Sequence, residues 1–180
     1  MERKPTVCWD EIKIPYLENI KKSETKRKTF KKKFLVLNPE HLYADATVKG
    51  EWVTNLIFYT SRPTIWQKSI CTTYDVTRVT LRAIQCGSQV TILDPNDTSS
   101  KSLDINIYDT GKVVINGNDV SLWEFKSTFF ELKTKMEESV HKKSKSEESD
   151  EKEEVEAKEE ENPPAQPDPA PTLAMENLKL

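Results

Sequence analysis

Glycine is scarce in this chain of 180 residues, which contains only Gly50, Gly87, Gly111 and Gly117. Phosphate-binding loops need clustered glycines, because the backbone must approach the phosphate groups closely. The sequence therefore offers neither a nucleotide-binding loop nor a dinucleotide fingerprint. The sequence also lacks the GxSxG motif of serine hydrolases, the HExxH motif of zinc proteases and the acidic pattern of calcium-binding loops. We expect no catalytic residues, no cofactor and no metal site.

Cysteine and histidine are also few. The three cysteines, Cys8, Cys71 and Cys86, are widely spaced and form no CxxC pattern. An odd number of cysteines without a spacing motif is typical of an intracellular protein with reduced thiols. With only two histidines besides, we expect no zinc site. His41 with Asp45 comes nearest to a base and its orienting acid. Because catalysis needs a third group in defined geometry, a surface histidine is the better interpretation.

Long apolar runs are missing too. The uncharged run from Trp52 to Ser61 has only about half the length that a membrane span needs. The first residues, Met-Glu-Arg-Lys-Pro, lack the apolar core of a secretion signal. These features predict a protein that is neither secreted nor membrane-spanning.

Charge of both signs is abundant and unevenly distributed. Residues 1–140 contain 21 Lys or Arg against 18 Asp or Glu, whereas residues 141–180 contain 6 against 12. Such asymmetry indicates a basic arm and an acidic tail around one ordinary domain. The predicted organisation is a flexible basic arm at 1–33, a sheet-plus-helix domain at 34–140, and a disordered acidic and proline-rich tail at 141–180.

The clearest secondary-structure pattern lies between Asp104 and Met136. Two alternating apolar runs flank a short loop, Asp109 to Gly111, which predicts a hairpin. The period then becomes helical, with one apolar stripe formed by Leu122, Phe125, Phe129, Leu132 and Met136. Ser121 and Glu124 have the spacing of a capping box, so this helix is predicted to run from Ser121 to about Ser139.

Other segments predict more strands. Val76–Ile84 alternates, and Val90 and Ile92 continue its apolar face. Phe34–Leu37 is typical of an edge strand, while Asn55–Tyr59 and Thr64–Ile70 flank a turn and predict a second hairpin. The expected fold is α+β: an antiparallel meander of four or more strands, covered on one face by the C-terminal amphipathic helix. No second element is evident to cover the opposite face.

Two features suggest contact with nucleic acid. Between Lys21 and Lys33, eight of thirteen residues are basic, and such a run attracts polyanions or a nuclear import receptor. The uncovered sheet face would carry arginines and a tyrosine, which suit phosphates and bases. The alternatives are a solubilising arm and an ordinary solvated face. The candidate nucleic-acid-binding residues are Lys26, Arg27, Lys28, Lys31, Lys32, Lys33, Arg78, Arg82, Tyr108 and Lys112.

Four meander strands followed by one helix, over Val76–Val140, resemble the repeat of the Pur-alpha and Whirly class of single-stranded nucleic-acid-binding proteins. The run from Ile107 to Gly117 is similar to a strand-turn-strand unit of uncharacterised mobile-element-associated proteins. Each resemblance covers about a third of the chain. The first implies that single-stranded DNA or RNA is the partner.

We therefore expect a non-enzymatic, nuclear, nucleic-acid-associated protein, with the basic arm and the sheet face contacting phosphates and bases. An import receptor is a further expected partner, and no membrane is involved. The alternative is an adaptor that docks a protein partner through its helix or its tails.

Overall fold

The computed structural model describes residues 8–46 and 52–159, with side chains up to Lys143. The chain divides into two units, 1–140 and 141–180, and α3 begins in the first. The helices are α1 (Glu24–Leu37), α2 (Pro63–Thr73), the short 3₁₀ turn η1 (Val76–Arg78) and α3 (Asp119–Glu159). The strands are β1 (Tyr43–Ala46), β2 (Val53–Tyr59), β3 (Val79–Ile84), β4 (Gly87–Leu93), β5 (Lys101–Tyr108) and β6 (Lys112–Gly117).

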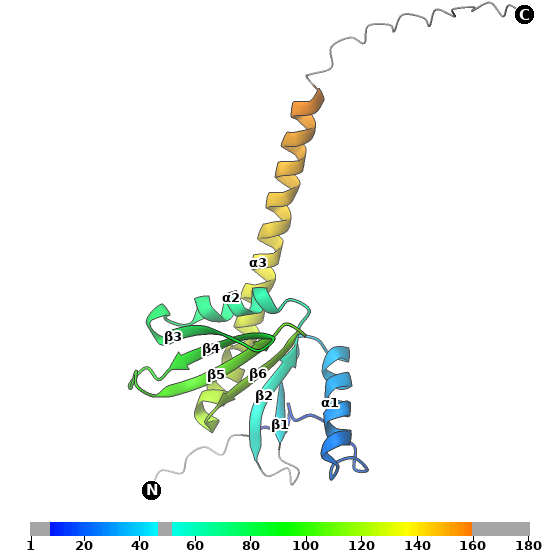
Figure 1. Ribbon diagram of the computed structural model, residues 1–180, viewed down its shortest axis with the longest axis vertical. Helices are drawn as coiled ribbons and strands as arrows, with labels where there is room; N and C mark the ends of the chain where they lie inside the picture. The colour runs from blue at the N-terminus through cyan, green and yellow to red at the C-terminus, as the bar shows by residue number, and fades with distance from the viewer. Residues whose placement is uncertain (1–7, 47–51, 160–180) are drawn as a thin grey trace, which may run out of the picture. The chain divides into compact units, whose positions relative to one another are not determined.

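The six strands form one antiparallel sheet in the order β1-β2-β6-β5-β4-β3 (Figure 1). The chain leaves β2, passes through α2 to the far edge, and returns by a meander from β3 to β6. Gly111 closes the last hairpin with φ of 95°. A β-carbon at Gly111 would meet the Thr60 carbonyl oxygen at 2.1 Å, so this position requires glycine. The prediction of an α+β fold with an antiparallel meander and a C-terminal helix is confirmed.

One face of the sheet carries the main core. Inward residues of β2, β4, β5 and β6 pack there against Trp66 and Ile70 of α2 and against the apolar stripe of α3. Phe125 of that stripe is fully buried, in the same cluster as Ile105 and Ile115. Most of the sheet residues expected on this face are buried, but Leu81 on β3 is 50% exposed, because it lies on the edge strand.

The opposite face is partly covered, which the sequence did not predict. Helix α1 places Leu35 in a second apolar cluster with Ile57 of β2 and Ile14 of the N-terminal segment. Phe30 and Phe34 of α1 pack around this cluster, together with further aromatic residues and Val114 of β6. Helix α1 therefore lies over the β1-β2-β6 end of the sheet (Figure 1). Strands β5, β4 and β3 keep their polar side chains on this face.

Two segments predicted as strands are helical. Phe34–Leu37 forms the last turn of α1, and Thr64–Ile70 lies within α2. Pro63 occupies the first turn of α2, where its missing N–H costs nothing. Burial of Trp66, Ser69 and Ile70 at helical spacing orients α2 against the core. Short apolar runs fit both periods, and here tertiary packing selected the helix.

The basic segment expected to be a flexible arm also differs from the expectation. From Glu24 onward it is helical, and the Ser23 side chain accepts a hydrogen bond from the Lys26 amide at the helix start. Its aromatic residues recur at helical spacing between the lysines, so one side of the helix can be buried. Residues 1–7, which belong to the same predicted arm, lie outside the described part.

Helix α3 starts earlier and ends later than predicted. The Asn118 side chain accepts from the Ser121 amide at 2.9 Å, so Asn118, rather than a capping box at Ser121, satisfies the first turn. The Ser121 hydroxyl instead contacts Ser102 of β5 at 3.0 Å. The backbone continues helically to Glu159, well past Ser139. Residues 160–180 of the predicted tail lie outside the described part.

Candidate nucleic-acid interface

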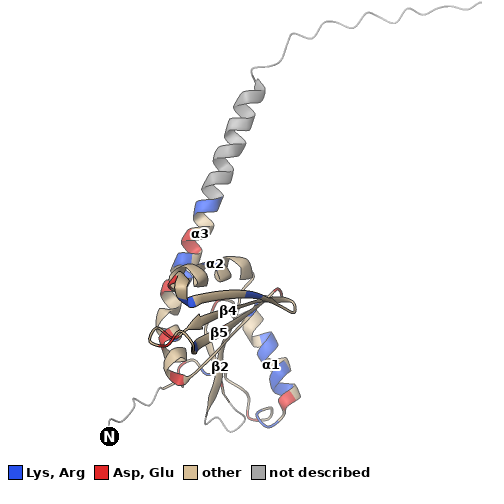
Figure 2. Ribbon diagram, turned by 60° about the vertical axis from the view of Figure 1, so that its left-hand side comes forward, with Lys and Arg blue, Asp and Glu red and all other residues tan. Residues whose placement is uncertain are grey.

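Helix α1 presents a basic outer side. Its fourteen residues contain six Lys or Arg and one acid, Glu24. Inward packing of Phe30, Phe34 and Leu35 leaves four lysines exposed: Lys26, Lys28, Lys32 and Lys33. Lys28 is paired with Glu24 at 2.8 Å, one helical turn away. The exposed lysines form a cationic surface on a folded helix, and Figure 2 marks the Lys and Arg positions along α1 in blue.

The other two basic residues of α1 hold the helix on the sheet. Lys31 Nζ lies 2.6 Å from Asp45 Oδ2, and the Tyr16 hydroxyl donates to Asp45 Oδ1 at 2.9 Å. The Arg27 guanidinium lies 4.4 Å above the Tyr16 ring and donates to the Ala46 carbonyl at 2.6 Å. Asp45 is only 8% exposed. Arg27 and Lys31 therefore position α1, and their charges are already engaged within the protein.

The electrostatics of this contact are visible at Tyr16. Burial raises the pKa of the Tyr16 hydroxyl above its ordinary value, and the nearby Asp45 carboxylate raises it further. The hydroxyl therefore stays protonated and keeps donating to Asp45. A buried carboxylate with one cationic and one neutral donor is well satisfied.

Beside α1, the uncovered part of the same sheet face forms a polar strip over β3, β4 and β5. Arg82 Nε donates to Gln89 Oε1 at 2.6 Å, and Gln89 Nε2 donates to Asn106 Oδ1 at 2.8 Å. One row of hydrogen bonds thus crosses three strands. In the next row, the Thr91 hydroxyl donates to Asp104 Oδ1 at 2.6 Å, and Lys101 lies 3.4 Å from the same carboxylate. These bonds fix the strip in one arrangement.

The register places the remaining candidates on this face, with one exception. Tyr108 is paired with Gly87 and Lys112 with Tyr59, so both side chains project on the side of Arg82 and Gln89. The Lys112 ammonium lies 5.2 Å from the centre of the Tyr108 ring. Arg78 is less available, because it lies in η1 and its Nε donates to the Leu93 carbonyl at 2.9 Å.

The structure thus divides the ten candidates from the sequence into two groups. Arg27, Lys31 and Arg78 are engaged in contacts that hold the fold. The other seven are the exposed lysines of α1 together with Arg82, Tyr108 and Lys112, and they share one side of the sheet. We call these seven residues the basic face.

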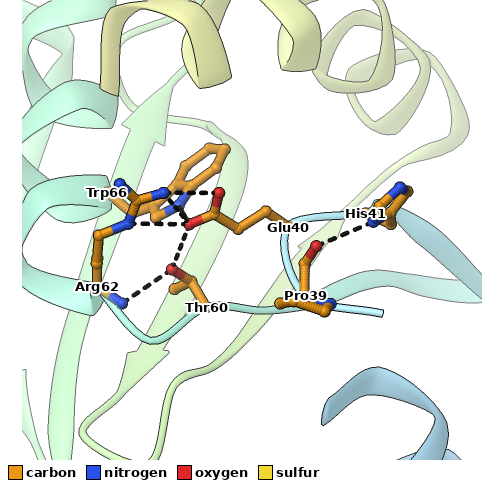
Figure 3. A network of polar contacts seen from close by, with 6 residues as sticks. All are labelled: Pro39, Glu40, His41, Thr60, Arg62 and Trp66. Carbon is orange, nitrogen blue, oxygen red and sulfur yellow. Dashed lines mark hydrogen bonds and ion pairs between the residues drawn. The ribbon is translucent and has the colours of Figure 1, made fainter. Parts of the chain in front are cut away.

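A second polar cluster, not expected from the sequence, surrounds Glu40 (Figure 3). Arg62 Nη2 lies 2.8 and 2.9 Å from the two Glu40 carboxylate oxygens, and the Thr60 hydroxyl donates at 3.0 Å. Trp66 Nε1 donates at 3.4 Å. Burial alone would raise the pKa of Glu40, but these donors outweigh it and hold the pKa below its ordinary value.

The Glu40 cluster is a structural clamp. Thr60 and Arg62 come from the β2-to-α2 connection and Trp66 from α2, so the carboxylate joins these segments to the turn before β1. Glu40 itself has φ of 59°. Nearby, His41 Nδ1 lies 2.9 Å from the Pro39 carbonyl and the imidazole is exposed, whereas Asp45 is bonded to Tyr16 and Lys31. Partners about twenty residues apart leave no local pattern that could have revealed this clamp.

Among the residues that the structure describes, no group of three or more His, Cys, Asp or Glu could hold a metal ion. In the same part of the chain, no helix combines the length and the apolar character needed to cross a membrane.

Comparison of the chain with models of protein families, with curated proteins and with solved structures found no match.

Proposed function

We propose that this protein binds single-stranded nucleic acid through the basic face and has no enzymatic role. One observation carries the proposal: the exposed lysines of α1 and the polar strip of β3 to β5 lie on the same side of one sheet. Lysines that are held apart on a helix can neutralise phosphates along a strand. The strip beside them offers amides, a guanidinium and one aromatic ring for the bases.

Charge distribution supports this side of the sheet over the other. On the outer side of α1 the only acid is Glu24, which is paired with Lys28. On the strip the acid is Asp104, and Lys101 lies beside it. Across the sheet, α3 up to Val140 carries five exposed carboxylates against three lysines, so its charge there is negative; the carboxylates are Asp119, Glu124, Glu131, Glu137 and Glu138. A polyanion is therefore attracted to the α1 side.

The salt dependence of binding tests the role of α1. A labelled thymidine oligonucleotide is titrated by fluorescence anisotropy at several salt concentrations. Changing Lys26, Lys32 and Lys33 together to Gln should lower the slope of log affinity against log salt by about 2, at about 0.7 for each phosphate contact. The matched control changes Lys68, Lys133 and Lys142 to Gln, which removes the same charge from α2 and α3. Equal slopes in the two triple variants would refute the proposal.

A separate variant tests the strip. Tyr108→Leu keeps an apolar side chain on β5 but removes the ring on which a base can stack. Base stacking on an aromatic ring is worth about 1 to 3 kcal/mol, so affinity should fall at least about fivefold at every salt concentration. The salt slope should stay unchanged, since no phosphate contact is lost. A variant that binds as the parent does would confine the interface to α1.

We also propose that the lysines of α1 serve in nuclear import. Removing residues 1–33 would test this poorly, because it deletes most of a helix that packs on the sheet. The triple Gln variant in a full-length fluorescent fusion keeps the inward side of α1. It should spread into the cytoplasm while the control triple stays nuclear, and equal distribution of the two would refute the import role.

One observation favours the adaptor alternative. Phe130 of α3 is 80% exposed, and Val120 and Trp123 of the same helix are 59% and 39% exposed. Exposed aromatic and aliphatic side chains at helical spacing suit a protein partner. A photo-crosslinking residue at position 130, compared with one at position 133, tests this contact. One defined crosslinked partner at position 130, together with no salt-dependent nucleic-acid binding, would make the adaptor the better proposal.

A further inference from the structure

Strand β3 is an open sheet edge. It is last in the strand order, and β4 is its one neighbour among the described strands. Its four central residues, Thr80 to Ala83, are all exposed. The six pairs between β3 and β4 run without a bulge, β3 contains no proline, and its one charged residue, Arg82, is bonded to Gln89 of β4. Exposed edges in monomers are normally blocked by such devices, so β3 is suited to pairing with another strand.

The other edge of the sheet is protected. Ile14 donates to the Ala44 carbonyl at 3.1 Å, and the Ala44 amide donates to the Ile12 carbonyl at 2.7 Å. The N-terminal segment thus lies along β1 as a short parallel addition. The pairing of β1 with β2 is also irregular between Asp45 and Ala46. The chain therefore covers one edge and leaves the other available.

The hairpin geometry shows which backbone groups of β3 face outward. Ile84 is paired with Gly87 across a two-residue loop, which makes this pair a hydrogen-bonded one. In an antiparallel ladder, hydrogen-bonded pairs alternate with non-hydrogen-bonded pairs, whose N–H and C=O groups point away from the partner strand. Leu81 and Ala83 consequently present both groups to the open side, whereas Val79 presents only its C=O, because its N–H already donates to the Val76 carbonyl. A strand added there would bond to both backbone groups of Leu81 and Ala83 and to the Val79 carbonyl.

Side-chain chemistry selects a register for self-pairing. When two identical strands pair in the antiparallel direction, a twofold axis relates them, and the residue at this axis pairs with its own counterpart. Residues directly opposite each other project from the same face of the sheet. With the axis at Arg82, two guanidinium groups would be opposite each other. With the axis at Thr80, Arg82 would oppose the partner's Arg78. With the axis at Leu81, Arg82 opposes the partner's Thr80, and no like charges meet.

We propose that a second copy of this chain pairs with β3 in the antiparallel direction, with Leu81 opposite the partner's Leu81. Leu81, half exposed in one copy, becomes buried against its counterpart, and Val79 faces the partner's Ala83. Backbone bonds supply the affinity and the apolar row supplies the register. The pairing closes as an isologous dimer, which removes the open edge.

This pairing does not depend on the proposed nucleic-acid function, but it has a consequence for it. A twofold axis perpendicular to the sheet keeps corresponding faces on the same side. Both copies of the basic face therefore lie on one side of a continuous sheet. If the protein binds nucleic acid as proposed, one strand can engage both copies, and affinity rises through effective concentration.

The test is sedimentation equilibrium of the full-length chain, from low micromolar to several hundred micromolar protein. The parent should show a reversible monomer–dimer equilibrium. Leu81→Lys places two ammonium groups at the twofold axis and should weaken the dimer at least about tenfold. The matched control, Phe130→Lys, makes the same kind of change at an exposed apolar residue of α3 and should leave the equilibrium unchanged. Circular dichroism verifies that each variant is folded.

A third variant tests the register and replaces Leu81→Lys if that chain does not fold. Thr80→Glu places a carboxylate opposite the partner's Arg82 twice in each dimer and should tighten it about fivefold. In the register centred on Thr80 the two carboxylates would meet and the dimer would weaken. A parent that stays monomeric, a Leu81→Lys protein that dimerises as the parent does, or a dimer weakened by Thr80→Glu overturns the proposal.

Discussion

Removing the Asp45 carboxylate should loosen helix α1 from the sheet. In the folded protein this carboxylate accepts the Tyr16 hydroxyl and pairs with Lys31, and its side chain is only 11% exposed. Asp45→Ala takes away both contacts and leaves both donors without this acceptor. The main core on the other face of the sheet contains Ala44 and Leu56 but not Asp45, so it should remain packed.

The size of the effect follows from the two contacts. A hydrogen bond to a charged group contributes about 1.5 to 3 kcal/mol, and breaking a fully buried ion pair costs about 3 to 5 kcal/mol. Lys31 is 25% exposed, so its ammonium can turn toward water and recover part of that loss. We therefore expect Asp45→Ala to lower the free energy of unfolding by about 3 kcal/mol.

Denaturant unfolding measures this change, and hydrogen exchange of the α1 amides locates it. The amides of α1 should exchange faster in the variant than those of β5 and β6. Asp10→Ala is the matched control, because the Asp10 side chain is also paired with a lysine, Lys13, but is 76% exposed. The stability of this variant should match that of the parent. An Asp45→Ala protein with parental stability and parental α1 exchange would show that the contact does not hold α1.

Two further changes test the core and the pH dependence. Phe125→Ala should cost about 3 to 5 kcal/mol in denaturant unfolding, because its ring is fully buried. Phe129→Ala should cost about half of that, because Phe129 is only partly buried, although its ring stacks on Trp66 with 5.3 Å between ring centres. A larger loss for Phe129→Ala than for Phe125→Ala would contradict this packing. The raised pKa of Tyr16 means that the unfolded chain ionises first, near pH 10, so stability should be intact below about pH 10 and fall above it. Tyr16→Phe should flatten that fall, and an unchanged alkaline limb of stability against pH would contradict the role of Tyr16.

Local patterns determined the C-terminal half of the domain. Alternation along β3 to β6 and the glycine turn before Lys112 specify neighbouring strands, which pair through short loops. The stripe of α3 matches the apolar face of that meander, so each element needs the other to leave water. Because these contacts join segments adjacent in sequence, the sequence alone was enough to predict them.

Only the tertiary structure decided the N-terminal half and the arrangement of the basic face. The aromatic residues of α1 fit a helix only when Ile57 and Val114 provide a surface to cover, and those residues lie on strands far along the chain. Lys31 and Lys32 are neighbours with the same charge, yet one is bound to Asp45 and the other is exposed. Composition identified a basic segment, but which lysines face solvent depends on which side of the helix the sheet buries. The physical reason is that burial is a property of contacts between distant segments, while local sequence fixes only period and charge.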